Sequence, residues 1–146
     1  MTHPPLRIAD LDTHGSWVDV AVPDTVERDY RAVTGFSGRQ PPAGLASVVA
    51  RLAYTRGRPM PPGGVLREIS QRSAGPPPAD GRWQARISSA LLGERSGRRR
   101  VAVIVALRGA PGGAPSRAAS AATGPADAHA LVASVRFLLD WPAGAA

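Results

Sequence analysis

Apolar and polar residues alternate near the start of the chain. From residue 14 to residue 23 the sequence reads HGSWVDVAVP, with valine at every second position from Val18 to Val22. A period of two places successive side chains on opposite faces of an extended backbone, so this stretch predicts a β-strand.

The pattern then changes to helical spacing. Asp24 and Glu27 have the spacing of a capping box, and apolar residues recur every three or four positions until Gly35. A second helix is predicted over about residues 43–55, where apolar or small residues occur on nearly all sides, and Gly57 is its expected C-cap. A helix without a polar face should be buried.

Four further segments read as strands. Three of them cover residues 65–73, 82–92 and 100–108, and the glycine- and serine-containing link GERSGRRR predicts a hairpin between the last two. Residues 109–128 are of low complexity and almost lack large apolar side chains, so they predict a mobile insertion. The segment from residue 129 to 141 is expected to be a closing strand, with a short helix as the alternative.

This order of elements predicts an α+β fold in which an antiparallel sheet packs against a buried helix. The chain has 146 residues, a length that predicts one domain over residues 1–146 with a core of its own. Residues 1–13 are expected to form a flexible N-terminal segment.

Composition changes this picture little. All 18 basic residues are arginine, lysine and asparagine are absent, and the net charge is +7. These biases are typical of a GC-rich genome, and the arginines are scattered except at Arg98–Arg100, so we do not expect a nucleic-acid partner. With no cysteine, the chain has no disulfide, thiol nucleophile or zinc–thiolate site, and we expect neither metal nor cofactor. No apolar run suits a membrane span or a signal peptide, which predicts a cytoplasmic protein.

Several segments, in their order, resemble the MaoC-like acyl dehydratases and hydratases of the hotdog fold. They are RDYRAVTG (Arg28–Gly35), the apolar helix after it, PMPPGGVLREISQRS (Pro59–Ser73), and PPPADGRWQARISSAL (Pro76–Leu91). The resemblance covers about residues 14–141. It implies a curved sheet around a central helix, pairing of two such units, and binding of acyl thioesters of coenzyme A or acyl carrier protein, as in fatty-acid or polyketide metabolism.

The resemblance also implies an Asp and a His in the loop after the first short helix, where they act as acid and base. Here that loop reads TGFSGRQPPAG, and Phe36 stands where the Asp is expected. No histidine occurs between His14 and His129, and residues 36–57 contain no Asp or Glu. The carboxylate that related thioesterases place on or before the central helix is therefore missing as well.

Three residues are candidates for a replacement catalytic group. His14 precedes the first strand, and a surface role is the simpler interpretation. Glu68 lies in the middle of a strand and could face a cleft, but a solvated strand face is the favoured interpretation because charged residues are mostly exposed. Asp80, beside Gly81, is typical of a turn.

Two residues are candidates for substrate binding. Arg39 precedes the buried helix, where an arginine and backbone N–H groups could hold a phosphate or carboxylate, and Gln40 could add a hydrogen bond. The run Arg98–Arg100 is interpreted as a solvated hairpin, with contact to an acidic carrier protein as the alternative.

The sequence therefore favours an acyl-thioester-binding hotdog protein without the usual Asp and His. It is expected to act as a homodimeric binder, or as the non-catalytic partner of an active, related hotdog protein in a heterodimer. The alternative is an active dehydratase, hydratase or thioesterase of the same fold that uses unconventional residues.

Overall fold

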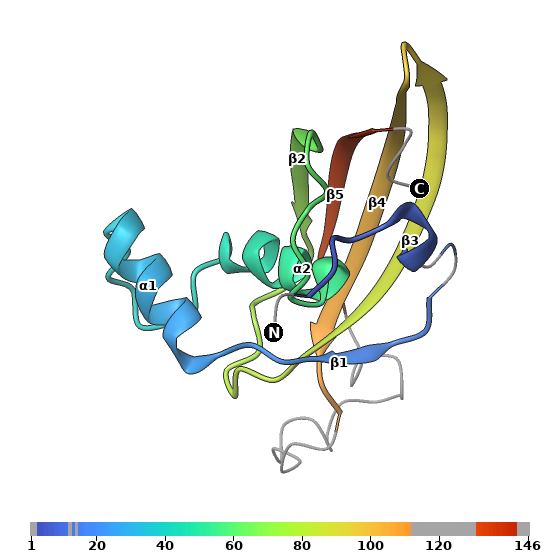
Figure 1. Ribbon diagram of the computed structural model, residues 1–146. Coiled ribbons are helices and arrows are strands. Elements are labelled where there is room, and N and C mark those ends of the chain that lie inside the picture. Colours follow the sequence, from blue (N-terminus) through green and yellow to red (C-terminus); the bar gives the residue numbers. More distant parts are fainter. Residues whose placement is uncertain (1–2, 12, 14, 112–130, 143–146) are drawn as a thin grey trace.

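The computed structural model describes residues 3–11, 13, 15–111 and 131–142, and contains one antiparallel sheet with a helix against it (Figure 1). The strand order is β1-β3-β4-β5-β2. The strands are β1 (Val18–Val20), β2 (Val65–Ser73), β3 (Trp83–Arg95), β4 (Arg98–Gly109) and β5 (Leu131–Pro142). The helices are α1 (Asp24–Thr34), α2 (Leu45–Thr55) and a short 3-10 helix, η1 (Ile8–Asp10). The predicted order of elements and the α+β class are confirmed.

The β3–β4 hairpin is longer than the sequence pattern predicted. Both strands continue to a two-residue turn at Ser96 and Gly97, whose φ angles are 53° and 71°. Positive φ at both turn residues matches the right-handed twist of a two-residue hairpin and favours glycine. The run Arg98–Arg100 is therefore part of β4, and not of the connection.

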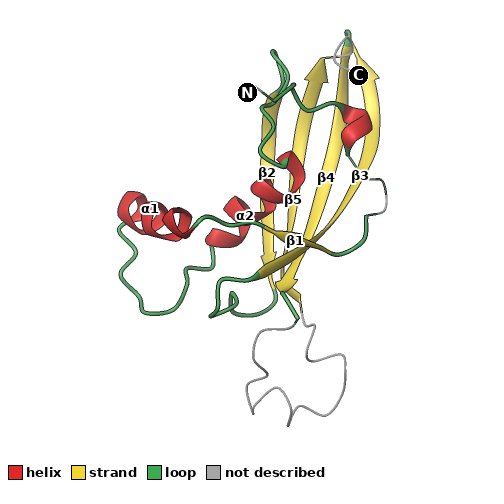
Figure 2. Ribbon diagram, turned by 60° about the horizontal axis from the view of Figure 1, so that its bottom comes forward, coloured by secondary structure: helices red, strands yellow, loops and turns green. Residues whose placement is uncertain are grey.

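Helix α1 projects away from the sheet in both views (Figures 1 and 2) and buries none of its residues. It ends at Gly35, whose φ of 73° gives the expected left-handed cap. The predicted capping box is wrong, because Pro23 is the N-cap and Asp24 is already helical. Glu27 instead accepts hydrogen bonds from Arg31, one turn further on.

Helix α2 is buried, as predicted, and contacts all five strands. Its small residues Ala46 and Ala50 are almost fully buried, which lets the helix lie close to the sheet. The expected cap at Gly57 is wrong by one residue. Arg56 takes the left-handed conformation, with a φ of 50°, and Gly57 follows with a φ of 73°.

Alternate residues of β5 form the centre of the core. Phe137, Leu139 and Trp141 are fully buried, and the ring centroids of Phe137 and Tyr54 lie 4.8 Å apart. The closing segment is thus a strand, and its alternative as a helix is wrong. Trp83 is also in the core, as expected for an aromatic residue on a half-buried sheet.

Trp17 differs from the other two tryptophans because it is only half-buried. The guanidinium carbons of Arg108 and Arg86 lie 4.0 and 5.1 Å from its ring centroid. These cation–π contacts hold the segment before β1 on the outer face of the sheet.

Residues 1–13 were predicted to form a flexible segment, whereas their described part packs on the body of the protein. Leu6 and Leu11 belong to the buried core, and the Leu6 amide donates to the Pro59 carbonyl at 2.8 Å. Arg58 donates to the Pro4 and Pro5 carbonyls and pairs with Asp10. The insertion predicted over residues 109–128 lies almost wholly outside the described residues. Among the residues described, no helix is long and apolar enough to span a membrane.

Candidate functional site

The loop between α1 and α2 is where the resemblance implies an acid and a base. Arg31 holds this loop against α1, because its guanidinium donates to the carbonyl oxygens of Gly38 and Gln40 and lies 5.2 Å from the Phe36 ring centroid. The Tyr30 hydroxyl packs so closely on Gly44, at the start of α2, that no room is left there for a Cβ. The loop is thus tied to both helices by contacts that do not involve an acid–base pair.

The two predicted substrate-binding residues lie in this loop with exposed side chains. The Arg39 side chain forms no hydrogen bond or ion pair with another described residue, and Gln40 contributes only its backbone carbonyl to Arg31. Neither residue lines the β1–α2 cavity, the acidic cavity or the arginine pocket, which are described below. Their role in binding stays a prediction.

An apolar cavity, the β1–α2 cavity, lies between the edge strand and the central helix. It has a volume of about 530 Å³, within the usual range for ligand pockets of about 300–1,000 Å³. Its lining is mostly aliphatic: Val18, Asp19, Val20, Ala21, Pro23, Leu52, Ala53, Arg56 and Gly57. Such an aliphatic surface accommodates a short alkyl chain best.

A second cavity, the acidic cavity, lies beside the segment that joins β1 to α1. It measures about 220 Å³ and is lined by three carboxylates, Asp24, Glu27 and Asp80, beside Leu45 at the start of α2. Pro23 lines both cavities. Because Glu27 is paired with Arg31 at 2.9 Å, Asp24 and Asp80 are the carboxylates left to face a ligand there.

The three candidate catalytic residues are not brought together. Asp80 accepts a hydrogen bond from the Arg82 amide at 3.0 Å, the turn geometry expected for it, and also lines the acidic cavity. Glu68 is exposed and pairs with Leu138, because a bulge after Leu66 turns Glu68 to the face of the sheet opposite α2. His14 lies outside the described residues. The described residues contain no group of three or more His, Asp or Glu placed to share a metal ion.

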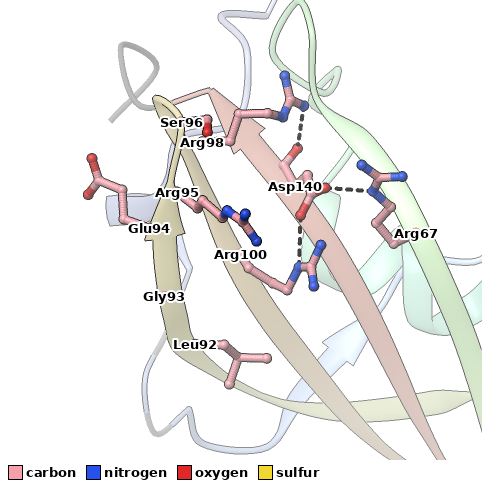
Figure 3. Close-up of a pocket in the computed structure, with 9 residues that line it drawn as sticks. All are labelled: Arg67, Leu92, Gly93, Glu94, Arg95, Ser96, Arg98, Arg100 and Asp140. Carbon is pink, nitrogen blue, oxygen red and sulfur yellow. Dashed lines mark hydrogen bonds and ion pairs between the residues drawn. The ribbon is translucent and has the colours of Figure 1, made fainter.

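A buried carboxylate that the sequence pattern did not single out, Asp140, lies near the end of β5. Asp140 is 5% exposed, and its two carboxylate oxygens accept hydrogen bonds from Arg100 Nε at 3.0 Å and Arg67 Nε at 2.5 Å (Figure 3). The hydrogen bonds from Arg100 and Arg67, in that order of effect, outweigh desolvation and lower the pKa of Asp140 to about 2. An aspartate within an apolar closing strand was the available signal, since a charged residue there needs a partner.

Comparison with known proteins supports the fold and no closer relationship. No family model and no curated protein matches the sequence. Among solved structures, the chain is similar to R-hydratase PhaJ1 from Pseudomonas aeruginosa in its unliganded form, with a TM-score of 0.52 and 14% sequence identity. The superposition covers 94% of this chain and 86% of the hydratase chain. Together with the five-stranded sheet around α2, this similarity shows that the chain has the hotdog fold.

Proposed function

We propose that the chain binds an acyl thioester of coenzyme A or acyl carrier protein without hydrating it, and serves as the non-catalytic partner in a dimer. One observation carries this proposal. The chain shares its fold with an R-hydratase, whereas its α1–α2 loop and α2 itself contain no Asp, Glu or His.

The missing residues matter because hydration of an enoyl thioester needs a base to activate water and an acid to protonate the α carbon. Phe36, which stands in the expected position of the Asp, has no group that accepts a proton. The residue is 40% exposed, and its ring lies beneath the Arg31 guanidinium. The carboxylates that line the acidic cavity, Asp24, Glu27 and Asp80, belong to other segments.

The β1–α2 cavity supports binding of the acyl chain. It is bordered by α2 and by aliphatic residues of β1, and its approximate volume of 530 Å³ accommodates a short acyl group. In this proposal the acyl chain lies against Leu52 and Ala53, and the thioester end lies towards Pro23 and the acidic cavity.

The edge strand β2 supports pairing with a second hotdog unit. Leu66 and Ile69 pair with buried residues of β5 and so lie on the face that carries α2, yet they are 38% and 46% exposed. An apolar edge strand with unpaired backbone groups is a surface that proteins normally cover. We propose that a second copy or a related chain covers it, and that residues 1–146 form one domain of a cytoplasmic protein.

Titration with butyryl-coenzyme A, measured by isothermal calorimetry, tests the binding site. The Ala21→Trp variant should weaken binding because it fills the β1–α2 cavity, whereas Leu91→Trp, on an exposed part of β3, should not. Melting curves without ligand establish that both variants fold. Equal affinity of the two variants, or no binding by the natural chain, would refute the proposed acyl site.

An active enzyme is the second candidate, and the acidic cavity is the observation in its favour. Asp80 and Asp24 both line it beside the start of α2, where two carboxylates could divide acid and base roles. A screen of enoyl and acyl thioesters against the natural chain and the Asp80→Asn, Glu68→Gln and His14→Ala variants separates the two candidates. Turnover that one of these substitutions removes would favour the enzyme.

A further inference from the structure

The β3–β4 hairpin carries an arginine-rich pocket that the proposed acyl site does not use (Figure 3). It measures about 400 Å³ and is lined by Arg67, Leu92, Gly93, Glu94, Arg95, Ser96, Arg98, Arg100 and Asp140. Leu139 and Trp141 point into the core, so Asp140 between them lies on the opposite face of the sheet from α2. We call this site the arginine pocket.

Asp140 fixes two guanidinium groups in a way that leaves most of their donors free. It accepts from the Nε atoms of Arg67 and Arg100, and the Nη atoms of these two arginines donate to no described residue. The two side chains remain 55% and 51% exposed although they are anchored. Their terminal N–H groups are therefore held in place and accessible to a ligand.

The pocket has more positive than negative charge. Four arginines line it against Asp140 and Glu94, and Glu94 is paired with Arg99 at 3.3 Å and points away from the other side chains (Figure 3). Arg98 donates to the carbonyl oxygens of Gly63 and Asp140. Arg95 reaches into the space between the hairpin and Asp140, and its side chain forms no hydrogen bond or ion pair within the described part of the chain.

Two arginines already donate to the two carboxylate oxygens of Asp140, so pairing with this one carboxylate does not account for all four arginines of the pocket. Like charges held in one pocket repel each other, and a bound anion relieves that repulsion. Guanidinium groups donate parallel hydrogen bonds that match the oxygens of a phosphoryl group, and a phosphate can engage several of them at once. A charged lining of this kind suits a polar anion and not an acyl chain.

From these observations we propose that the arginine pocket binds a phosphoryl anion through the free Nη groups of Arg67 and Arg100 together with Arg95. The volume of the pocket leaves room for a diphosphate or for a phosphate carried by a small organic molecule. This inference does not depend on the acyl-thioester proposal, because it concerns the other face of the sheet.

Calorimetric titration of the full chain with inorganic pyrophosphate, and separately with ADP, tests the site. Both ligands should bind at one site per chain. Arg95→Ala should weaken binding about tenfold, the effect of losing one hydrogen bond to a charged group, without disturbing Asp140. Arg67→Lys should also weaken binding, because an ammonium group paired with Asp140 leaves no planar pair of donors.

The matched control is Arg72→Ala, which removes the same charge from an exposed position on β2 outside the arginine pocket. It should change either affinity by less than about twofold. Equal affinity for the two ligands means that the phosphoryl group itself is recognised, whereas tighter binding of ADP means that the pocket takes an organic phosphate. The proposal would be overturned if neither ligand binds, or if the Arg72 and Arg95 variants lose the same amount of affinity.

Discussion

The contact between Phe137 on β5 and Tyr54 on α2 predicts a measurable coupling between helix and sheet. The Phe137 side chain is fully buried, Tyr54 is 2% exposed, and their ring planes are inclined by 59°. Tilted aromatic pairs contribute about 0.5–1.5 kcal/mol beyond the area that they bury. The contact should therefore add a term of that size to the free energy of unfolding.

Three variants isolate this term: Phe137→Leu, Tyr54→Leu and the double variant. Each single change should cost about 1–3 kcal/mol, the usual range for reshaping a core side chain. The double variant should be less destabilised than the sum of the single variants by about 0.5–1.5 kcal/mol, because the ring contact is lost only once. Leucine is preferable to alanine here, since Phe→Ala costs about 3–5 kcal/mol and could unfold a domain of ordinary stability.

Urea unfolding, followed by far-ultraviolet circular dichroism, gives the four free energies. The control pairs Tyr54→Leu with Leu91→Ala, whose side chain is 58% exposed on β3, and these two changes should be additive within about 0.5 kcal/mol. If the aromatic pair were equally additive, α2 would not pack against β5 as described, and the helix-on-sheet core would be wrong.

Three further predictions concern pH, ligand and assembly. The Asp140→Asn variant should be less stable than the natural chain above about pH 4, and the difference in stability should shrink as the pH falls from 3.8 towards 2. The reason is that Asp140, paired with two arginines, keeps its charge in the folded state to a lower pH than in the unfolded state. A difference that stays constant in acid unfolding curves would contradict this. Affinity for saturated acyl-coenzyme A should rise by at most about fourfold for each added methylene, because burying one methylene contributes about 0.8 kcal/mol. The rise should stop when the β1–α2 cavity is filled. Calorimetry that shows no dependence on chain length would place the acyl chain elsewhere. The Ile69→Glu variant should shift a dimer towards monomer in light scattering, whereas Glu68→Gln, on the opposite face of the same strand, should not.

Much of the fold could be predicted from periodicity because the core elements are strongly patterned. The predicted bounds of β2 coincide with Val65–Ser73 in the structure, and α2 differs only at its start. The order of elements in the sequence is also sufficient to indicate the hotdog fold. These successes share a cause: alternating or helical apolar patterns reflect burial, and burial determines the elements.

The features that the sequence pattern did not predict depend on contacts between distant residues. Asp140 pairs with Arg67 and Arg100, which are 73 and 40 positions away, so no local pattern indicates the arginine pocket. The β3–β4 hairpin extends beyond its apolar part because backbone pairing continues through charged residues. Leu6 lies in a proline-rich segment without periodicity, and its burial follows from the tertiary contact with Pro59.

The candidate site was predicted less well than the fold, for a related reason. The absence of Asp, Glu and His around the start of α2 can be read from the sequence alone. The two cavities beside α2 cannot, since they arise where β1 and the segment after it cross the helix. The bulge that turns Glu68 away from α2 could not be read from the sequence either. A shift of one residue in the strand register changes the face of every later side chain.

Binding without catalysis is tested most directly by measuring both the binding and the hydration of crotonyl-coenzyme A in the same preparation of the purified chain. We expect saturable binding at one site per chain and no hydration above the rate in buffer. Hydration by the chain alone, at a rate that substitution of a single side chain such as Asp80→Asn abolishes, would contradict the non-catalytic role.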